Sequence, residues 1–131
     1  MSNAKSPYIH ADSNGVKVLP MTGTDPRCPA GLPQRDMLGH VYEIHAERHS
    51  AVFRLGELKF QQGPVKDYGV NGITLEALLA VGIHRLDLLN NQFPCSENET
   101  ALQGMKEALA ALEARTAARQ AKGVEGTNVA H

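Results

Sequence analysis

The sequence predicts an α+β protein in which a small antiparallel β-sheet is followed by a two-helix antiparallel hairpin. The chain has 131 residues, of which 42% are hydrophobic, and this suits one compact core. Residues 39–60 are rich in β-forming side chains, whereas residues 74–122 carry apolar side chains at helical spacing. Because the two periodicities occupy separate stretches, we expect the sheet and the helices to be segregated along the chain.

The first 36 residues are predicted to be an irregular segment. Glycines and prolines recur through this segment, at Gly15, Pro20, Gly23, Pro26, Pro29, Gly31 and Pro33. Their density rules out a helix, and only residues 16–19 offer a short strand. We therefore expect residues 1–36 to lie across the surface or to be partly mobile, and residues 37–131 to form a single domain.

Residues 37–62 are predicted to form a β-hairpin, with residues 47–49 as its connecting loop. In the second half of this stretch apolar side chains alternate with polar ones, as in a half-buried strand. Leu55 and Leu58 are three residues apart, so the alternation slips by one residue at Gly56. A β-bulge at that glycine would restore the register.

Residues 74–122 are predicted to form a helical hairpin. Thr74 is a suitable N-cap for a first helix over residues 75–89, which carries leucines along one face. Residues 96–99 read as a capping box that starts a second helix. That helix keeps one apolar stripe until Gly123, made of Leu102, Met105, Leu109 and Leu112. The connection between the helices is short, which predicts antiparallel neighbours.

The charge balance excludes a global attraction to nucleic acid or to an anionic membrane. Thirteen Lys and Arg residues stand against fourteen Asp and Glu residues, for a net charge of -1. Apolar runs are too short to span a bilayer, and Cys28 and Cys95 follow neither a zinc spacing nor a disulfide pattern. We expect a cytoplasmic protein with no DNA partner and no membrane partner.

Arg115, Arg119 and Lys122 are the main candidates for binding an anion. They fall at i, i+4 and i+7, on one face of the final turns of the second helix. The alternative is that they only complement the helix dipole. The two predicted helices differ in length, so that the second would extend about 15 Å beyond the first and end in these three residues. We name Arg115, Arg119 and Lys122 the basic stripe.

The histidines do not predict a metal site. His40 and His45 would point to opposite faces of a strand, and His49 would lie in the turn. Cys95 precedes a helix start, which favours a thiolate, but no histidine lies near it in the sequence, and a packed loop thiol is expected. Phe93 either stacks on a base or plugs the end of the hairpin. We expect no cofactor, no metal and no catalytic residue.

Five segments carry residues in a recognisable order. They are Gly63-Pro-Val-Lys-Asp-Tyr-Gly-Val-Asn-Gly-Ile-Thr-Leu-Glu-Ala-Leu-Leu, His84-Arg-Leu, Cys95-Ser-Glu-Asn, Arg115-Thr and Lys122-Gly-Val-Glu-Gly-Thr. In these segments, which extend over roughly half of the chain, it resembles the hairpin domain shared by phage anti-Thoeris and anti-CBASS sponge proteins. Strands before the hairpin make the layout more similar to the anti-Thoeris branch.

The resemblance implies a protein that sequesters nucleotide signals of bacterial immune systems without cleaving them. The implied ligands are glycocyclic ADP-ribose and, in some members, cyclic di- or trinucleotides. It also implies that Asn98, Arg115 and Arg119 contact the ligand. The family has an aromatic residue where this chain has Leu89, so Phe93 is the candidate replacement, and Lys122 is an additional candidate contact.

If Asn98 and Arg115 contact one ligand, as the resemblance implies, their positions predict a site shared between two chains. They are separated on one helix by about 25 Å, which is too far for both to hold one small ligand. A two-fold pairing of hairpins would bring Asn98 of one copy to Arg115 and Arg119 of the other and would create two equivalent sites. We therefore expect a homodimer, or a multiple of dimers, with the ligand at the interface.

Two other functions are compatible with the same residues. One is a small enzyme that degrades the nucleotide, with a histidine as acid or base. The other is a purely structural module whose hairpin serves only dimerisation, with the arginines solvated at the helix end. Nucleic-acid binding is disfavoured because the charge is balanced and aromatic residues make up only 5% of the chain.

Overall fold

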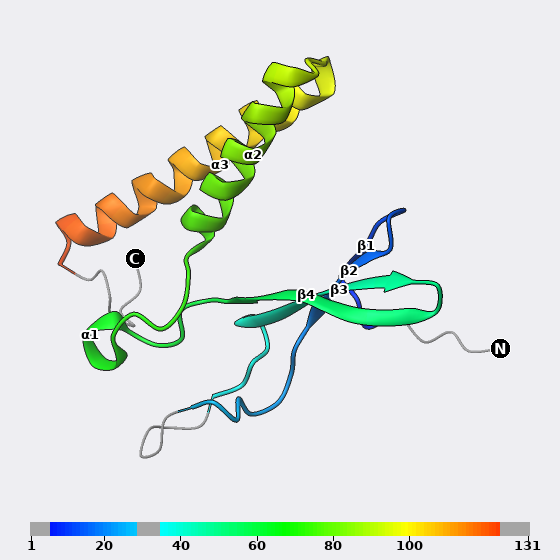
Figure 1. Ribbon diagram of the computed structural model, residues 1–131. Helices are drawn as coiled ribbons and strands as arrows, with labels where there is room; N and C mark the ends of the chain where they lie inside the picture. The colour runs from blue at the N-terminus through cyan, green and yellow to red at the C-terminus, as the bar shows by residue number, and fades with distance from the viewer. Residues whose placement is uncertain (1–5, 29–34, 124–131) are drawn as a thin grey trace. The chain divides into compact units, whose positions relative to one another are not determined.

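The computed structural model describes residues 6–28 and 35–123 (Figure 1). Its contacts divide the chain into two compact units, Met1–Gln62 and Gly63–His131. The first unit is a four-stranded sheet and the second is helical, which confirms the predicted α+β class. The elements are β1 (His10–Ala11), β2 (Val16–Pro20), β3 (Val41–Arg48), β4 (Ala51–Lys59), α1 (Val65–Tyr68), α2 (Leu75–Gln92) and α3 (Ser96–Ala121).

The sheet has the order β1-β2-β3-β4, and every neighbouring pair is antiparallel. β2 contains the predicted strand at residues 16–19 and pairs with β3 from Val16 to Pro20. The segment that was expected to be irregular therefore contains strands between residues 10 and 20. The glycines and prolines of this segment do not interrupt the strands, because Gly15 lies in the turn and Pro20 ends β2.

The β1–β2 turn is held by the Asp12 side chain and by Gly15. One carboxylate oxygen of Asp12 accepts hydrogen bonds from the backbone N–H groups of Asn14 and Val16, at 2.9 and 3.1 Å. Gly15 has φ +83°, and its carbonyl accepts a hydrogen bond from the Glu47 N–H at 2.9 Å. The turn is thereby anchored to β3.

The predicted β-hairpin is confirmed as β3 and β4, but its turn lies further along the chain than expected. Residues 47 and 48 still belong to β3, and His49 and Ser50 form the connection with φ of 50° and 66°. Positive φ at both central residues matches the right-handed twist of the flanking strands.

The predicted β-bulge at Gly56 is also confirmed. Ile44 pairs with Gly56, whereas the next residue, His45, pairs with Arg54. Leu55 is left without a partner in β3, which is the extra residue that a bulge inserts. After the bulge the alternation of β4 resumes, and Leu58 pairs with Tyr42.

The helical hairpin is confirmed, and its boundaries differ by a few residues from the prediction. The Thr74 hydroxyl accepts a hydrogen bond from the Ala77 N–H at 3.1 Å, so Thr74 is the N-cap of α2. α2 continues to Gln92 instead of ending at residue 89. Gly69, with φ 69°, ends the short helix α1, which the sequence did not predict.

The predicted capping box at residues 96–99 is wrong. Ser96 is already the first residue of α3, and the N-cap is Cys95, whose side chain makes no capping hydrogen bond. The Cys95 N–H donates instead to the side-chain oxygen of Asn90 at 3.1 Å. The end of α2 therefore holds the connection to α3, and the Ser96 hydroxyl lies 3.4 Å from the Glu97 carboxylate.

α2 and α3 pack as antiparallel neighbours over an apolar stripe (Figure 1). Leu102 is the buried hydrophobic residue among those described in this unit, and the other members of the α3 stripe are half-buried. The helices approach closely at Gly82, where an added Cβ would lie 3.3 Å from the Met105 sulfur. No helix among the described residues is long and apolar enough to cross a membrane.

Candidate functional site

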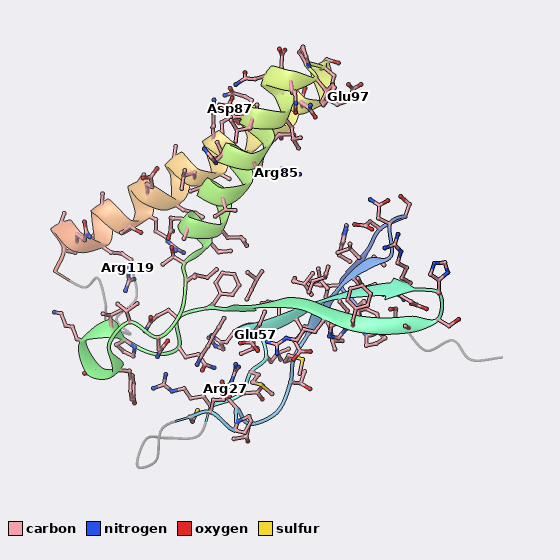
Figure 2. The ribbon with its side chains drawn as sticks, in the orientation of Figure 1. Arg27, Glu57, Arg85, Asp87, Glu97 and Arg119 are labelled. Carbon is pink, nitrogen blue, oxygen red and sulfur yellow. The ribbon has the colours of Figure 1, made fainter. Side chains whose placement is uncertain are left out.

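The basic stripe lies at the carboxyl end of α3, where the helix dipole favours cations. Figure 2 labels Arg119 there, in the last turn. Lys122 follows as the exposed C-cap, and its backbone N–H donates to the Ala118 carbonyl at 3.1 Å. α2 has 18 residues and α3 has 26, which makes α3 longer by about 12 Å rather than 15 Å.

Arg115 lies beside the first turn of α2. Its Nη2 is 3.9 Å from Oε1 of Glu76, and the two side chains are 57% and 23% exposed. This separation forms an ion pair but is too long for a hydrogen bond. Oε1 of Glu76 is buried and has no hydrogen-bond partner. The basic stripe therefore begins next to a carboxylate oxygen with unused acceptor capacity.

A hollow of about 310 Å³ opens next to this ion pair, within the helical unit. We call it the α2–α3 hollow, and its lining residues are Glu76, Glu113, Thr116, Ala117 and Gln120. The hollow was not predicted from the sequence. A signal was present, because Thr116 is polar and stands four residues after Leu112, where the apolar stripe of α3 would continue.

Asn98 and Phe93 lie at the other end of the hairpin. Nδ2 of Asn98, in the first turn of α3, donates to the Phe93 carbonyl at 3.4 Å. Phe93 is the C-cap of α2, and its side chain is 69% exposed. That exposure is incompatible with a plug at the hairpin end, and it leaves the ring accessible for stacking.

One copy of the chain does not bring all the candidate residues together. Asn98 and Arg115 lie on the single continuous helix α3, separated by about 25 Å along its axis. Arg115 and Arg119 share one end with the α2–α3 hollow, and Asn98 and Phe93 share the other. The candidate residues thus form two separate groups, one at each end of the hairpin.

The start of α3 also contains an exposed thiol, Cys95, where a packed one was expected. The pKa of Glu97 is lowered, chiefly because its carboxylate accepts a hydrogen bond from its own backbone N–H, with further help from the side chains of Cys95 and Ser96. Within residues 6–28 and 35–123, no three His, Cys, Asp or Glu side chains are grouped so that they could hold a metal ion.

The sheet unit contains a buried ionic cluster around Asp25, which is 1% exposed. Its Oδ1 accepts hydrogen bonds from the backbone N–H and Nε of Arg27, at 2.9 and 3.2 Å. The Arg27 Nη1 donates to Glu57 at 2.6 Å, and Figure 2 labels both of these residues. Because carboxylates already occupy the guanidinium, this cluster is suited to holding the loop on the sheet rather than to binding phosphate.

A second hollow, of about 240 Å³, adjoins this cluster. Its lining combines apolar and charged side chains, from Met21, Pro26, Arg27, Met37, Val41, Glu43 and Glu57. None of the residues that the sequence singled out for ligand binding lines either hollow, but the α2–α3 hollow adjoins one of them through the ion pair between Glu76 and Arg115. The candidate site therefore remains on the hairpin.

Comparison with known proteins finds a family model that is similar to part of this chain. Residues 56–117 match the family model described as the Acb2/Tad1 hairpin domain. The match includes Phe93, Asn98 and Arg115, whereas Arg119 and Lys122 lie beyond its end.

The chain is also similar to a curated protein, Thoeris anti-defense 1 of Bacillus phage SBSphiJ7. The two are 45% identical over 76 residues, which is 57% of this chain. The aligned part spans 54% of that relative, so the chain matches about half of the relative's length. Over residues 56–117 the chain is therefore similar to the hairpin domain of the Acb2/Tad1 family.

Proposed function

We propose that the protein captures a cyclic nucleotide signal without cleaving it and thereby inhibits a bacterial anti-phage defence in the cytoplasm of the host. The ligand classes are glycocyclic ADP-ribose and cyclic di- or trinucleotides. The observation that carries the proposal is the match of residues 56–117 to the Acb2/Tad1 hairpin domain, together with the relative named for anti-Thoeris activity. The basic stripe is the physical feature that supports an anionic ligand.

Each candidate residue has a role that its chemistry supports. Arg115 and Arg119 bind phosphate oxygens through charge-assisted hydrogen bonds. Asn98 hydrogen-bonds to ribose or phosphate, and Lys122 adds a further cation. Phe93, with 69% of its side chain exposed, covers a base in place of the aromatic residue absent at Leu89.

The site is formed by two copies of the chain, as a homodimer or a multiple of dimers. Asn98 and Arg115 reach one ligand only when they belong to different hairpins. A second observation supports such pairing. α2 exposes Leu75, Val81 and Leu88 at 51%, 67% and 55%, so the described helices leave apolar surface available for another copy.

Capture and degradation are distinguished by recovery of the ligand. The protein is incubated separately with cyclic di-AMP, a cyclic trinucleotide and cyclic ADP-ribose isomers, then heated, and the released nucleotide is analysed by chromatography and mass spectrometry. We expect at least one of them to raise the melting temperature, because a ligand at 100 times its Kd stabilises the folded state by about 2.7 kcal/mol. It should be recovered intact. A cleaved product would support the enzyme instead.

The structural-module alternative is tested by the double variant Arg115→Ala/Arg119→Ala. Under our proposal it loses the ligand-induced rise in melting temperature and keeps its oligomeric state in analytical ultracentrifugation. Lys106→Ala is the matched control, because Lys106 is an exposed cation in the middle of α3. If no nucleotide stabilises the wild-type protein while dimerisation is normal, the structural module is the better account.

A further inference from the structure

The α2–α3 hollow contains an acceptor that needs a donor. Oε1 of Glu76 is buried without a hydrogen-bond partner, and the nearest cation, Arg115, is 3.9 Å away. A buried polar atom without a partner costs folding free energy, so such atoms usually meet a water or a ligand. Thr116 and Gln120 add a hydroxyl and an amide to the same wall. The lining of the hollow therefore offers several hydrogen-bonding groups, one of which has no partner.

The chemistry of the lining selects the part of a nucleotide that it can take. The carboxylates of Glu76 and Glu113 repel phosphate, but they accept hydrogen bonds from hydroxyl or amino groups. The volume of about 310 Å³ lies at the lower end of small-molecule sites. It accommodates one nucleoside portion rather than a complete cyclic dinucleotide.

The position of Arg115 distinguishes a ribose from a base. Arg115 and Glu76 are only 3.9 Å apart, so a group bound by Glu76 must be close in the ligand to the phosphate bound by Arg115. A ribose hydroxyl is a few bonds from the phosphate on the same sugar, whereas a base amino group is much farther away. Pairing of a carboxylate with ribose hydroxyls is also the arrangement used in dinucleotide-binding folds.

We propose that the α2–α3 hollow is a ribose subsite, in which Glu76 accepts a hydrogen bond from a ribose hydroxyl of the nucleotide whose phosphate lies on Arg115. This inference rests on the proposed function and adds its sugar specificity. A site built to hydrogen-bond a hydroxyl discriminates against the analogue that lacks it, because the acceptor is then left unpaired. The protein thus prefers ribonucleotide rings to deoxyribonucleotide rings of the same charge.

The test compares two ligand pairs by isothermal titration calorimetry. The probes are 3′,3′-cyclic di-AMP with its 2′-deoxy analogue and cyclic ADP-ribose with its deoxyribose analogue. We expect the wild-type protein to bind the ribose form of at least one pair about tenfold more tightly or better. Equal affinity for the ribose and deoxyribose forms overturns the ribose subsite and leaves the proposed function standing. Absence of binding by every probe overturns the ribose subsite, and it overturns the proposed function as well if a cyclic trinucleotide and glycocyclic ADP-ribose also fail to bind.

Substitutions assign the discrimination to the hollow. Glu76→Met keeps the length of the side chain and removes its oxygens, and it should reduce the ribose preference to about twofold or less. Thr116→Val is a second, nearly isosteric change in the same wall and should reduce the preference partially. Glu107→Gln, a change at an exposed residue in the middle of α3, is the control and should keep it. If Glu76→Met and Thr116→Val both retain the full preference, the subsite lies elsewhere.

Discussion

Gly15 shows how one residue joins two strands of the sheet. It has φ +83°, and a Cβ at this position would lie 2.5 Å from the Glu47 carbonyl oxygen. Gly15→Ala should therefore cost about 1 to 3 kcal/mol or more through backbone strain and the clash. Gly23→Ala is the matched control, because Gly23 has φ +86° but nothing within 4 Å of the added carbon. Urea denaturation should show the larger loss for Gly15→Ala, and equal losses would contradict the clash.

Asp25 makes the stability of the sheet unit dependent on acid pH. Hydrogen bonding by the Arg27 N–H, followed by the Arg27 side chain and Lys59, holds the pKa of Asp25 below its ordinary value of 3.8. Folding thus favours the ionised form. The stabilisation of the folded state by ionised Asp25 is complete above pH 3.8, and it is lost as the pH falls through the lower pKa that Asp25 has in the folded state.

The Asp25→Asn variant tests this linkage. It should be less stable at pH 7 by about 1 to 3 kcal/mol and should lose less of its remaining stability between pH 4 and pH 2. Asp67→Asn is the comparison, because this exposed carboxylate lies in α1. A wild-type stability that falls no more steeply than that of Asp25→Asn over this range contradicts the assignment to Asp25.

At the scale of elements, Leu102 is the buried leucine of the described helical hairpin, since it is 7% exposed. Leu102→Ala should destabilise the helical unit by about 2 to 5 kcal/mol, because it removes buried methyl groups and leaves a cavity. Leu88→Ala, at a leucine that is 55% exposed, is the comparison. Circular dichroism during urea denaturation measures the loss of stability in both variants. The Leu102 effect should not depend on protein concentration, whereas any Leu88 effect should. A loss below 1 kcal/mol for Leu102→Ala would place the core elsewhere.

The long elements were predictable because their periodic patterns run over many residues. The leucines of α2 and the stripe of α3 repeat over several turns, and the slip at Gly56 located the bulge. β1 and α1 have two and four residues, too few to show a period. The prediction for the start of α3 was wrong by one residue: the helix already begins at Ser96, with Cys95 as its N-cap, so the Ser96 hydroxyl does not stand at the capping position and lies 3.4 Å from the Glu97 carboxylate.

The candidate site was predictable only in part, for a related reason. Arg115, Arg119 and Lys122 were identified because spacing within one helix is readable from the sequence. Glu76 was missed because its relation to Arg115 exists only after α2 folds back on α3. The α2–α3 hollow is a tertiary feature, and Thr116 alone marked it by its polarity on an apolar stripe.

At the scale of the whole molecule, the proposed ligand site combines Asn98 of one copy with the arginines of another. Asn98→Ala alone and Arg115→Ala/Arg119→Ala alone should each bind a cyclic nucleotide much more weakly than wild type, because each homodimer lacks one half of every site. A mixed dimer should contain one intact site and one doubly defective site.

The most direct measurement is the ligand stoichiometry of an equal mixture of these two variants, unfolded together and refolded, by isothermal titration calorimetry. Random pairing yields mixed dimers for half of the population, so about a quarter of the wild-type number of sites should return at wild-type affinity. The control is a mixture of the two variants that were refolded separately, titrated before their subunits exchange. This mixture should bind the ligand only weakly. A co-refolded mixture that binds no better than this control would show that the two half-sites do not meet across an interface.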